Sequence, residues 1–325
     1  MDTLDKFKVI SIVGNTKNAG KTTVLNYYLE KFDKPIGLSS IGLDGEEIDQ
    51  VNFLEKPRIF VDKGYFIATA SETLKYFTCK YQIARTTGIF TSIGEVIIVE
   101  VTSPGKALIA GPAKVIEMAK IIELLNNEPV EKIIIDGAFS RQIFSRLSQA
   151  TILVIGANYS NDMNAVVNNA RLNIKQLNLN VITDDRLVGQ NNICLIDEMN
   201  QLERLDYSTV IGNVDAFFKL DFSRVKYVYF PRSITNQFVE RLIKERHNVS
   251  FDIILDSPTY LQLSDKNLEN LFKLKLKIFV TNPINLAAVF YNPFSPRGYE
   301  FSNIEFKECL EKALKQKVYN VLKDG

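Results

Sequence analysis

Short apolar, β-branched runs alternate with longer stretches of helical periodicity through most of the chain. Runs such as Ile133–Ile135 lack polar residues at alternate positions, which is typical of strands buried on both faces of a parallel sheet. Strands are expected at residues 8–14, 36–41, 58–61, 65–70, 95–101, 132–137, 151–156 and 192–197, with helices at 22–32, 113–127 and 162–178. This alternation predicts an α/β fold with a doubly wound, mostly parallel sheet.

The stretch 58–70 interrupts this alternation. Two short apolar runs lie on either side of Lys63-Gly64, with no room for a helix between them. A pair of strands joined by a tight turn that contains glycine is typical of a β-hairpin, so the stretch predicts a hairpin inserted on the sheet.

After about residue 205 the alternation of apolar runs and helical stretches begins again, which predicts a second, smaller α/β unit. Its strands are expected at 225–230, 251–256, 277–282, 287–292 and 318–322, and its helices at 233–245, 265–275 and 303–315. The predicted division is therefore 1–205 and 206–325. No linker rich in Pro, Gly or Ser marks the boundary, so a single continuous sheet remains an alternative.

Composition and charge exclude several classes of protein. Apolar residues make up 46% and charged residues 24%, as in ordinary globular proteins, and the net charge of +1 favours neither nucleic acid nor an anionic membrane. The sequence shows no signal peptide, and no apolar run approaches the roughly 18 residues of a membrane helix. Three widely spaced cysteines and a single histidine argue against a zinc site or a histidine-based triad. The expected location is the cytoplasm.

The sequence GNTKNAGKTT, residues 14–23, resembles a phosphate-binding loop with one extra residue. The usual pattern is Gly, four residues, then Gly-Lys-Ser/Thr, whereas here Gly14 lies one position further back and Asn15 occupies the usual place of the glycine. A buried strand precedes the loop and an amphipathic helix follows it, which is the setting that a phosphate site requires. The alternative is a Gly-Lys-Thr that merely starts a helix, with Lys21 in solvent.

Each residue of the loop has a role in the phosphate-site hypothesis. Backbone N–H groups at Asn18, Ala19, Gly20 and Lys21 would point at the β-phosphate, assisted by the helix dipole. Lys21 would place its charge at the β- and γ-phosphates, and the hydroxyl of Thr22 would bind Mg²⁺. Thr23 would reach the α-phosphate.

Three carboxylates are candidates to hold the metal or to orient the attacking group. Asp136 ends the apolar strand IIID and would reach Mg²⁺ through water, although Asp-Gly is also a common turn signal. Glu100 lies inside the strand EVIIVEV, where a buried acid must be paired; it would bind metal or substrate, or pair with a lysine. Asp44, in the loop GLDGEE, would be a metal ligand or position water, and a solvated acidic loop explains it equally well.

The base of the nucleotide is weakly encoded. The Asn-Lys-x-Asp motif that recognises guanine is absent, which favours ATP over GTP. Asn282 follows a strand and would contact the base, although Asn282-Pro283 is equally well explained as a turn.

Several motifs together resemble known families. The spacing G-x5-G-K-T resembles dethiobiotin synthetase, and KNAGKTT is similar to the loop of accessory GTP-binding proteins for molybdopterin guanine dinucleotide. VGNTKNAGKTTVLN, GLDGEE, KPRIFVDKGYFIATA, IIIDGAFSR and YNPFSPRGYEF, taken together, resemble the P-loop accessory subunit of lysine 5,6-aminomutase reactivase. That resemblance implies a P-loop NTPase whose nucleotide turnover releases damaged cobalamin from an aminomutase, together with a separate ATPase subunit.

Three functions remain open on the sequence. The first is a nucleoside triphosphatase that uses Mg²⁺ and remodels a partner enzyme, such as an adenosylcobalamin-dependent aminomutase. The second is a synthetase of the dethiobiotin-synthetase type, which activates a carboxyl or carbamate group with ATP. The third is a nucleotide-binding scaffold with little turnover. A homodimer is open in each case.

Overall fold

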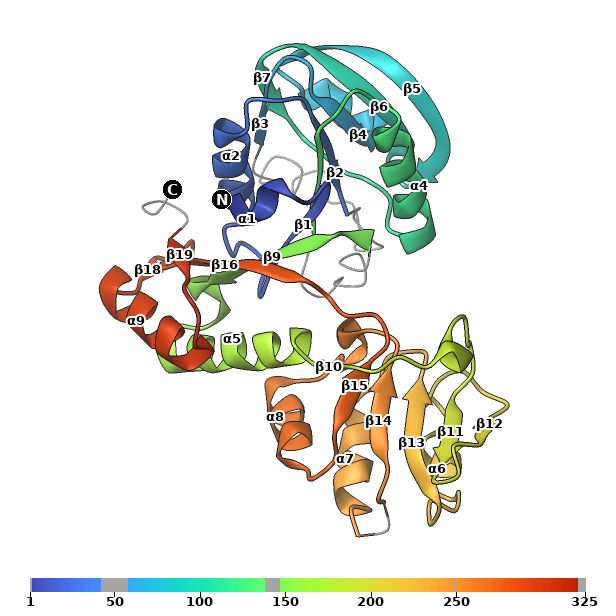
Figure 1. The fold of residues 1–325 in the computed structure, drawn as a ribbon. Helices are drawn as coiled ribbons and strands as arrows, with labels where there is room; N and C mark the ends of the chain where they lie inside the picture. Colours follow the sequence, from blue (N-terminus) through green and yellow to red (C-terminus); the bar gives the residue numbers. More distant parts are fainter. Residues whose placement is uncertain (1, 42–57, 138–146, 248, 321–325) are drawn as a thin grey trace. The chain divides into compact units, whose positions relative to one another are not determined.

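The computed structural model describes residues 2–41, 58–137, 147–247 and 249–320, which form two compact units (Figure 1). Unit 1 comprises Met1–Val167 and Asn285–Gly325, and unit 2 comprises Asn168–Ile284. This division differs from the predicted 1–205 and 206–325, because unit 2 is an insertion within unit 1. The chain leaves unit 1 within helix α5 (Met163–Leu177) and returns just before strand β16 (Leu286–Asn292), which pairs with β9 (Ala150–Gly156) of unit 1.

Unit 1 is built on a nine-stranded, mostly parallel sheet, which confirms the predicted α/β class. In the order β19-β16-β9-β1-β8-β2-β4, neighbouring strands are parallel, and β6 and β5 then add antiparallel pairings at one edge. Besides β9 and β16, the sheet contains β1 (Val9–Gly14), β2 (Ile36–Ser40), β4 (Phe66–Ala70), β5 (Lys80–Thr91), β6 (Gly94–Ser103), β8 (Lys132–Asp136) and β19 (Tyr319–Asn320).

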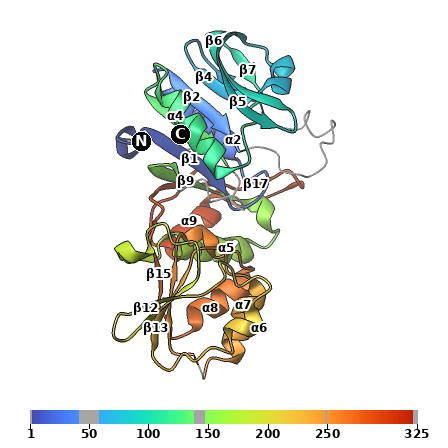
Figure 2. The same ribbon diagram turned by 90° about the vertical axis from the view of Figure 1, so that its right-hand side faces the viewer.

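Helices α2 (Lys21–Lys31) and α4 (Val115–Asn126) belong to separate apolar cores of unit 1. Ile134 of β8 lies in the core that contains Val24 and Leu25 of α2, whereas Ile133 and Ile135 lie in the core that contains Met118 of α4. Because alternate residues of a strand point to opposite faces, β8 is covered on both sides. Figure 2 shows α4 in front of β1 and β2, the two neighbours of β8 in the sheet. The uninterrupted isoleucine run in the sequence follows from this two-sided burial.

The hairpin expected at residues 58–70 is wrong. Strand β3 (Ile59–Val61) pairs instead with β7 (Gly105–Ala107), and β4 joins the large sheet between β2 and β6. Gly64 does turn the chain, with φ of 87°. However, the next strand has all five residues buried, so it gains more by entering the middle of the sheet than by pairing with β3.

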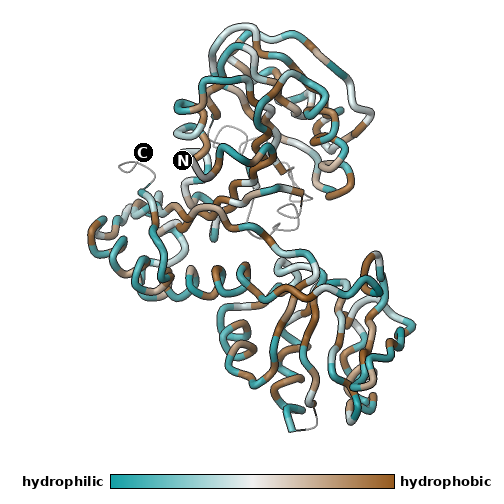
Figure 3. Tube along the Cα trace, in the orientation of Figure 1, coloured by the Kyte–Doolittle hydropathy of each residue, from teal (hydrophilic) through white to brown (hydrophobic). Residues whose placement is uncertain are grey.

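Other short elements complete unit 1. They are α1 (Asp2–Asp5), η1 (Ser71–Tyr76), η3 (Ala157–Tyr159), β17 (Phe294–Ser295), β18 (Tyr299–Glu300) and α9 (Asn303–Leu314). Apolar residues gather along the strands of each unit (Figure 3).

Unit 2 has a six-stranded sheet in the order β10-β15-β14-β13-β11-β12. Its strands are β10 (Asn180–Val181), β11 (Cys194–Asp197), β12 (Leu202–Arg204), β13 (Val225–Phe230), β14 (Asp252–Leu255) and β15 (Ile278–Val280). Its helices, besides the later part of α5, are η4 (Asp185–Leu187), α6 (Val214–Phe217), α7 (Asn236–Lys244), η5 (Pro258–Tyr260) and α8 (Asp265–Lys273). The fully buried ring of Phe217 packs 5.7 Å from Phe230 and 5.4 Å from Phe238, and so joins helix to sheet. Among the described residues, no helix is long and apolar enough to cross a membrane.

Tyr28 on α2 makes the stability of unit 1 sensitive to alkaline pH. Burial, with a smaller contribution from Asp5, raises the pKa of Tyr28 to about 12. Because the unfolded chain loses this proton near pH 10, folding stability is fully present below pH 10 and declines as the pH rises towards 12. We expect Tyr28→Phe to reduce this decline, as measured by urea unfolding at pH 9, 10 and 11. Tyr27→Phe on the same helix is the control, and an equal effect of both variants would contradict the expectation.

Candidate functional site

The loop between β1 and α2 has the backbone conformation of an anion-binding turn. We call residues 14–20 the glycine loop. Within it, Asn18 has φ of 57° and Gly20 has φ of 103°, both in the left-handed region. Alternation of right- and left-handed residues is the geometry in which successive N–H groups form a concave nest for an anion. Gly20 occupies the position before the first helical residue, Lys21, so the nest lies at the positive end of the helix dipole.

Gly14 leaves room for the loop and for the stem of Lys21, which both lie against it. A Cβ atom at Gly14 would lie 3.0 Å from Cβ of Ala19 and 3.1 Å from Cγ of Lys21. The aliphatic part of Lys21 therefore folds back over the end of β1. A side chain at residue 14, one position beyond the usual spacing, would therefore be in close contact with both Ala19 and Lys21.

Asn15 ties the glycine loop to the neighbouring strand β9. Its side chain is buried, its Oδ1 accepts a hydrogen bond from the N–H of Gly156 at 2.9 Å, and its own N–H donates to the carbonyl of Val154 at 3.0 Å. The extra residue of the loop is thus a structural anchor. The sequence pattern showed only that a glycine was missing there.

Ala19 packs directly on Gly156 at the carboxyl end of β9. Ala19 is fully buried, and a Cβ atom at Gly156 would lie 2.5 Å from its Cα. A contact this short excludes any side chain at Gly156, because the clash would be with backbone. The loop is therefore held against β9 by backbone-to-backbone packing as well as by Asn15.

Two further asparagines reach the glycine loop, one from η3, which follows β9, and one from the end of β16. Asn158 donates from Nδ2 to the carbonyl of Lys17 at 2.9 Å, and its Oδ1 accepts from the hydroxyl of Ser295 at 3.1 Å. Nδ2 of Asn292, the last residue of β16, lies 3.0 Å from where a Cβ of Gly20 would be. Sequence reasoning missed both residues. Asn292-Pro293 carries the same Asn-Pro signal as Asn282-Pro283, and the base contact was expected only of Asn282.

Asp136 lies on the other side of β1 from these asparagines. It ends β8, where it is level with Ile12 of β1 and Ser40 of β2, and its side chain is half-buried. Thr22 is half-buried and Thr23 exposed on the first turn of α2. A hydroxyl and a carboxylate at the same carboxyl edge of a parallel sheet are oxygen donors of the kind that Mg²⁺ takes alongside water.

No protein-family model, curated protein or solved structure matches the chain. The resemblance to the reactivase subunit therefore rests on the quoted motifs. The chemistry of the site has to be argued from the geometry of the glycine loop and of the strand ends around it.

Glu100 is not part of this site. It lies on β6, four strands from β1 in the sheet order, or roughly 19 Å at the usual strand spacing. It pairs with Phe66, the first residue of β4, so it lies near the amino edge of the parallel strands, opposite the glycine loop. Its carboxylate accepts a hydrogen bond from Gln82 at 2.6 Å. The sequence could not show that β6 runs antiparallel, which places this acid at the wrong edge.

Asn282 and the glycine loop belong to different units of the chain. Asn282 belongs to unit 2, where its Nδ2 donates to Asp256 at 2.8 Å and to Thr281 at 3.1 Å. It acts there as a polar link beyond the end of β15. Asp44, the third expected carboxylate, lies outside the described residues.

Asn15 offers a test of how firmly the loop is anchored. We expect Asn15→Ala to lower the free energy of unfolding by about 1–3 kcal/mol, because the buried N–H of Gly156 loses its acceptor. Asn126→Ala, at an exposed position of α4, is the matched control and is expected to change stability by less than about 0.5 kcal/mol. Urea denaturation measures both, and equal effects would show that Asn15 anchors nothing.

Proposed function

We propose that the chain binds and hydrolyses a nucleoside triphosphate with Mg²⁺ as an accessory protein that remodels a partner enzyme. The observation that supports this best is the path of Lys21. Its stem folds back over Gly14 from the first turn of α2, at the end of a strand whose neighbour ends in Asp136. A cationic side chain, a nest of N–H groups and a carboxylate thus lie at one sheet edge, which is what triphosphate binding requires.

Each side chain has a role that follows from its place. The N–H groups of the glycine loop and the dipole of α2 hold the β-phosphate, and Lys21 neutralises charge on the β- and γ-phosphates. The hydroxyl of Thr22 and the carboxylate of Asp136 would hold Mg²⁺, which would supply positive charge to the phosphate oxygens. In hydrolysis a water oxygen forms a bond to the γ-phosphorus while the bond from the γ-phosphorus to the bridging oxygen breaks, which gives the diphosphate and phosphate.

The arrangement favours ATP over GTP. With Asp136 on one side of β1, the nucleoside extends over the opposite side, towards the ends of β9 and β16, where Asn292 lies. An asparagine amide offers one acceptor and one donor, which matches N6–H and N7 of adenine, whereas guanine presents two acceptors at this edge. Asn292 thus takes over the base contact that was expected of Asn282.

The partner is proposed from the resemblance alone. It implies an adenosylcobalamin-dependent aminomutase and a second ATPase subunit, and the buried, unpaired cysteines Cys79 and Cys194 are compatible with a cytoplasmic setting. The synthetase alternative is retained because the enlarged loop spacing resembles that of dethiobiotin synthetase. ATP turnover that depends on a small carboxylic acid would favour a synthetase, and turnover stimulated by an aminomutase would favour the reactivase function.

Lys21 is the residue with which to test the nucleotide site. We expect Lys21→Ala to weaken Mg·ATP binding by about 10- to 100-fold, because a charge-assisted contact to phosphate is lost. Lys17→Ala removes an exposed lysine of the same loop but keeps the carbonyl that Asn158 holds, so it should bind as the unchanged protein does. Isothermal titration measures both. Absence of ATP and GTP binding by the unchanged protein would end the nucleotide hypothesis.

Asn292 tests the choice of base. We expect Asn292→Ala to weaken ATP binding about tenfold and to leave GTP binding nearly unchanged, so that the preference for ATP is lost. Asn285→Ala, just before the start of β16, is the control. Asn285 donates to the carbonyl of Gln149, away from the glycine loop. Competition between the two nucleotides for a fluorescent analogue measures the ratio. An unchanged ratio would remove Asn292 from base recognition.

A further inference from the structure

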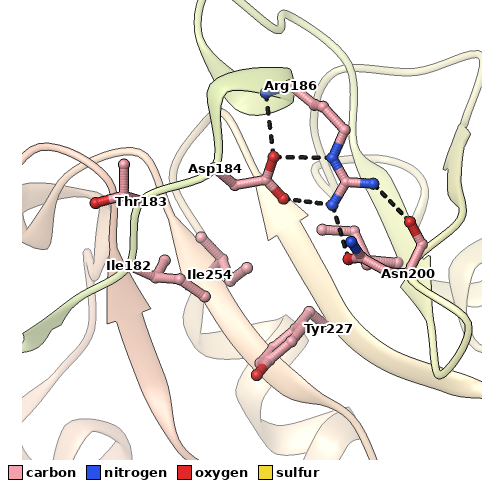
Figure 4. A pocket seen from close by; sticks show the side chains of 8 residues that line it. Ile182, Thr183, Asp184, Arg186, Asn200, Tyr227 and Ile254 are labelled. Carbon is pink, nitrogen blue, oxygen red and sulfur yellow. Dashed lines mark hydrogen bonds and ion pairs between the residues drawn. The ribbon is translucent and has the colours of Figure 1, made fainter.

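Unit 2 carries a pocket of about 330 Å³ that has no part in the proposed nucleotide site (Figure 4). The floor is formed by side chains of three adjacent strands, Ile196 of β11, Tyr227 of β13 and Ile254 of β14. Ile196 and Ile254 lie in a separate cluster from Phe217 and the helices α7 and α8, so the pocket is on the other face of the sheet. A volume in the range of small-molecule sites over an apolar floor is suited to a compact ligand.

The polar wall of the pocket is the ion pair of Arg186 and Asp184, which is held in place by hydrogen bonds to Asn200. Arg186 donates from Nε to Oδ1 of Asp184 at 2.9 Å and from Nη2 to Oδ2 at 2.5 Å. It also donates from Nη1 to the carbonyl of Asn200 at 2.6 Å and from Nη2 to Oδ1 of Asn200 at 2.9 Å. Figure 4 shows Arg186 between Asp184 and Asn200, with Tyr227 across the floor.

The backbone around the ion pair orients these side chains without a bound ligand. Asn200 has φ of 62°, a left-handed conformation that brings its carbonyl and its side chain to the same guanidinium. Asp184 also accepts from the N–H of Arg186 at 3.1 Å, at the start of the turn η4. Rotation of the arginine would break several hydrogen bonds at once, so the wall is rigid.

These contacts decide which chemistry the pocket can recognise. Arg186 uses one N–H of Nε, both of Nη2 and one of Nη1, which leaves one of five for a ligand. It therefore lacks the pair of parallel donors with which arginine binds phosphate or carboxylate. What remains is the flat face of the guanidinium, the ring of Tyr227 and the lone pairs of Asp184. A flat guanidinium face stacks on aromatic rings.

We propose that this pocket binds a neutral, planar aromatic ring that carries an N–H or O–H donor. The ring stacks on the guanidinium of Arg186 and contacts Tyr227, and its donor is accepted by Asp184. An indole, a phenol or the base of a nucleoside has this chemistry. The ring can belong to a free metabolite or to an exposed side chain of a partner protein.

The sequence makes the test simple, because the chain contains no tryptophan. N-acetyltryptophanamide is titrated with the full chain, and its own fluorescence anisotropy reports binding. We expect a Kd of about 0.1–1 mM for this ligand size. N-acetyltyrosinamide and adenosine compete in separate arms and show which ring is preferred, and N-acetylleucinamide is the aliphatic control. Adenosine is also tested on Lys21→Ala protein, so that failure of the nucleotide site does not affect the result.

Two variants connect binding to the pocket. Tyr227→Leu keeps the apolar floor but removes the ring, and is expected to weaken binding about fivefold or more. Arg186→Gln removes the flat cation and should do the same, while Tyr319→Leu, at a half-exposed tyrosine of unit 1, should have no effect. The proposal is overturned if aromatic and aliphatic probes bind equally weakly, or if binding survives both pocket variants.

Discussion

Close packing of Ala19 on Gly156 is the contact on which the candidate site depends. It places the backbone of the glycine loop directly against the end of β9, at a distance that no side chain at residue 156 would allow. The hydrogen bonds of Asn15 and Asn158 fix the orientation of the loop, because they hold it near its start at Asn15 and at its middle residue, Lys17. The parallel strands then bring Asp136, Gly156 and Asn292 to the same edge. A rigid loop needs little reorganisation when an anion binds, since its N–H groups are oriented beforehand.

The sequence predicted the parts of this arrangement that depend on local pattern. Buried strands such as β1 and β8 are apolar on both faces, and α2 follows a glycine loop with recognisable spacing, so both were found at nearly the right residues. The pairing of strands depends on contacts between distant segments. For that reason the sequence did not show that β3 pairs with β7, that β6 runs antiparallel, or that Glu100 lies at the opposite edge. The same limit applies to Asn292, because its Asn-Pro signal is identical to that of Asn282-Pro283 and does not show which of the two lies near the glycine loop.

The insertion of unit 2 into unit 1 could not be recognised from the alternation of strands and helices along the sequence. Unit 2 is itself an α/β sheet, so its strands continue the rhythm of unit 1 and no change of composition marks where it begins. The helix α5 crosses the boundary without a break. Its later turns are fixed in unit 2 by buried polar residues, since Asn169 donates to Asp265 at 3.0 Å and Gln176 to the carbonyl of Pro258 at 2.7 Å. Because Asn169 and Asp265 are far apart in the sequence, the pattern of the helix alone did not show this docking.

The position of Asn292 has a consequence for synthesis of the protein. The glycine loop is made early in translation, but two residues near it, Asn292 and Ser295, follow the whole of unit 2 in the chain. While unit 2 is being made, the loop therefore emerges from the ribosome without its β16 neighbours, and β9 has one edge unpaired. An ATP-binding surface would be completed only after the insertion has been translated. The order of the segments thus delays both completion of the large sheet and placement of Asn292 at the glycine loop until unit 2 has been translated, and a truncated product would hold the loop sequence without these neighbours.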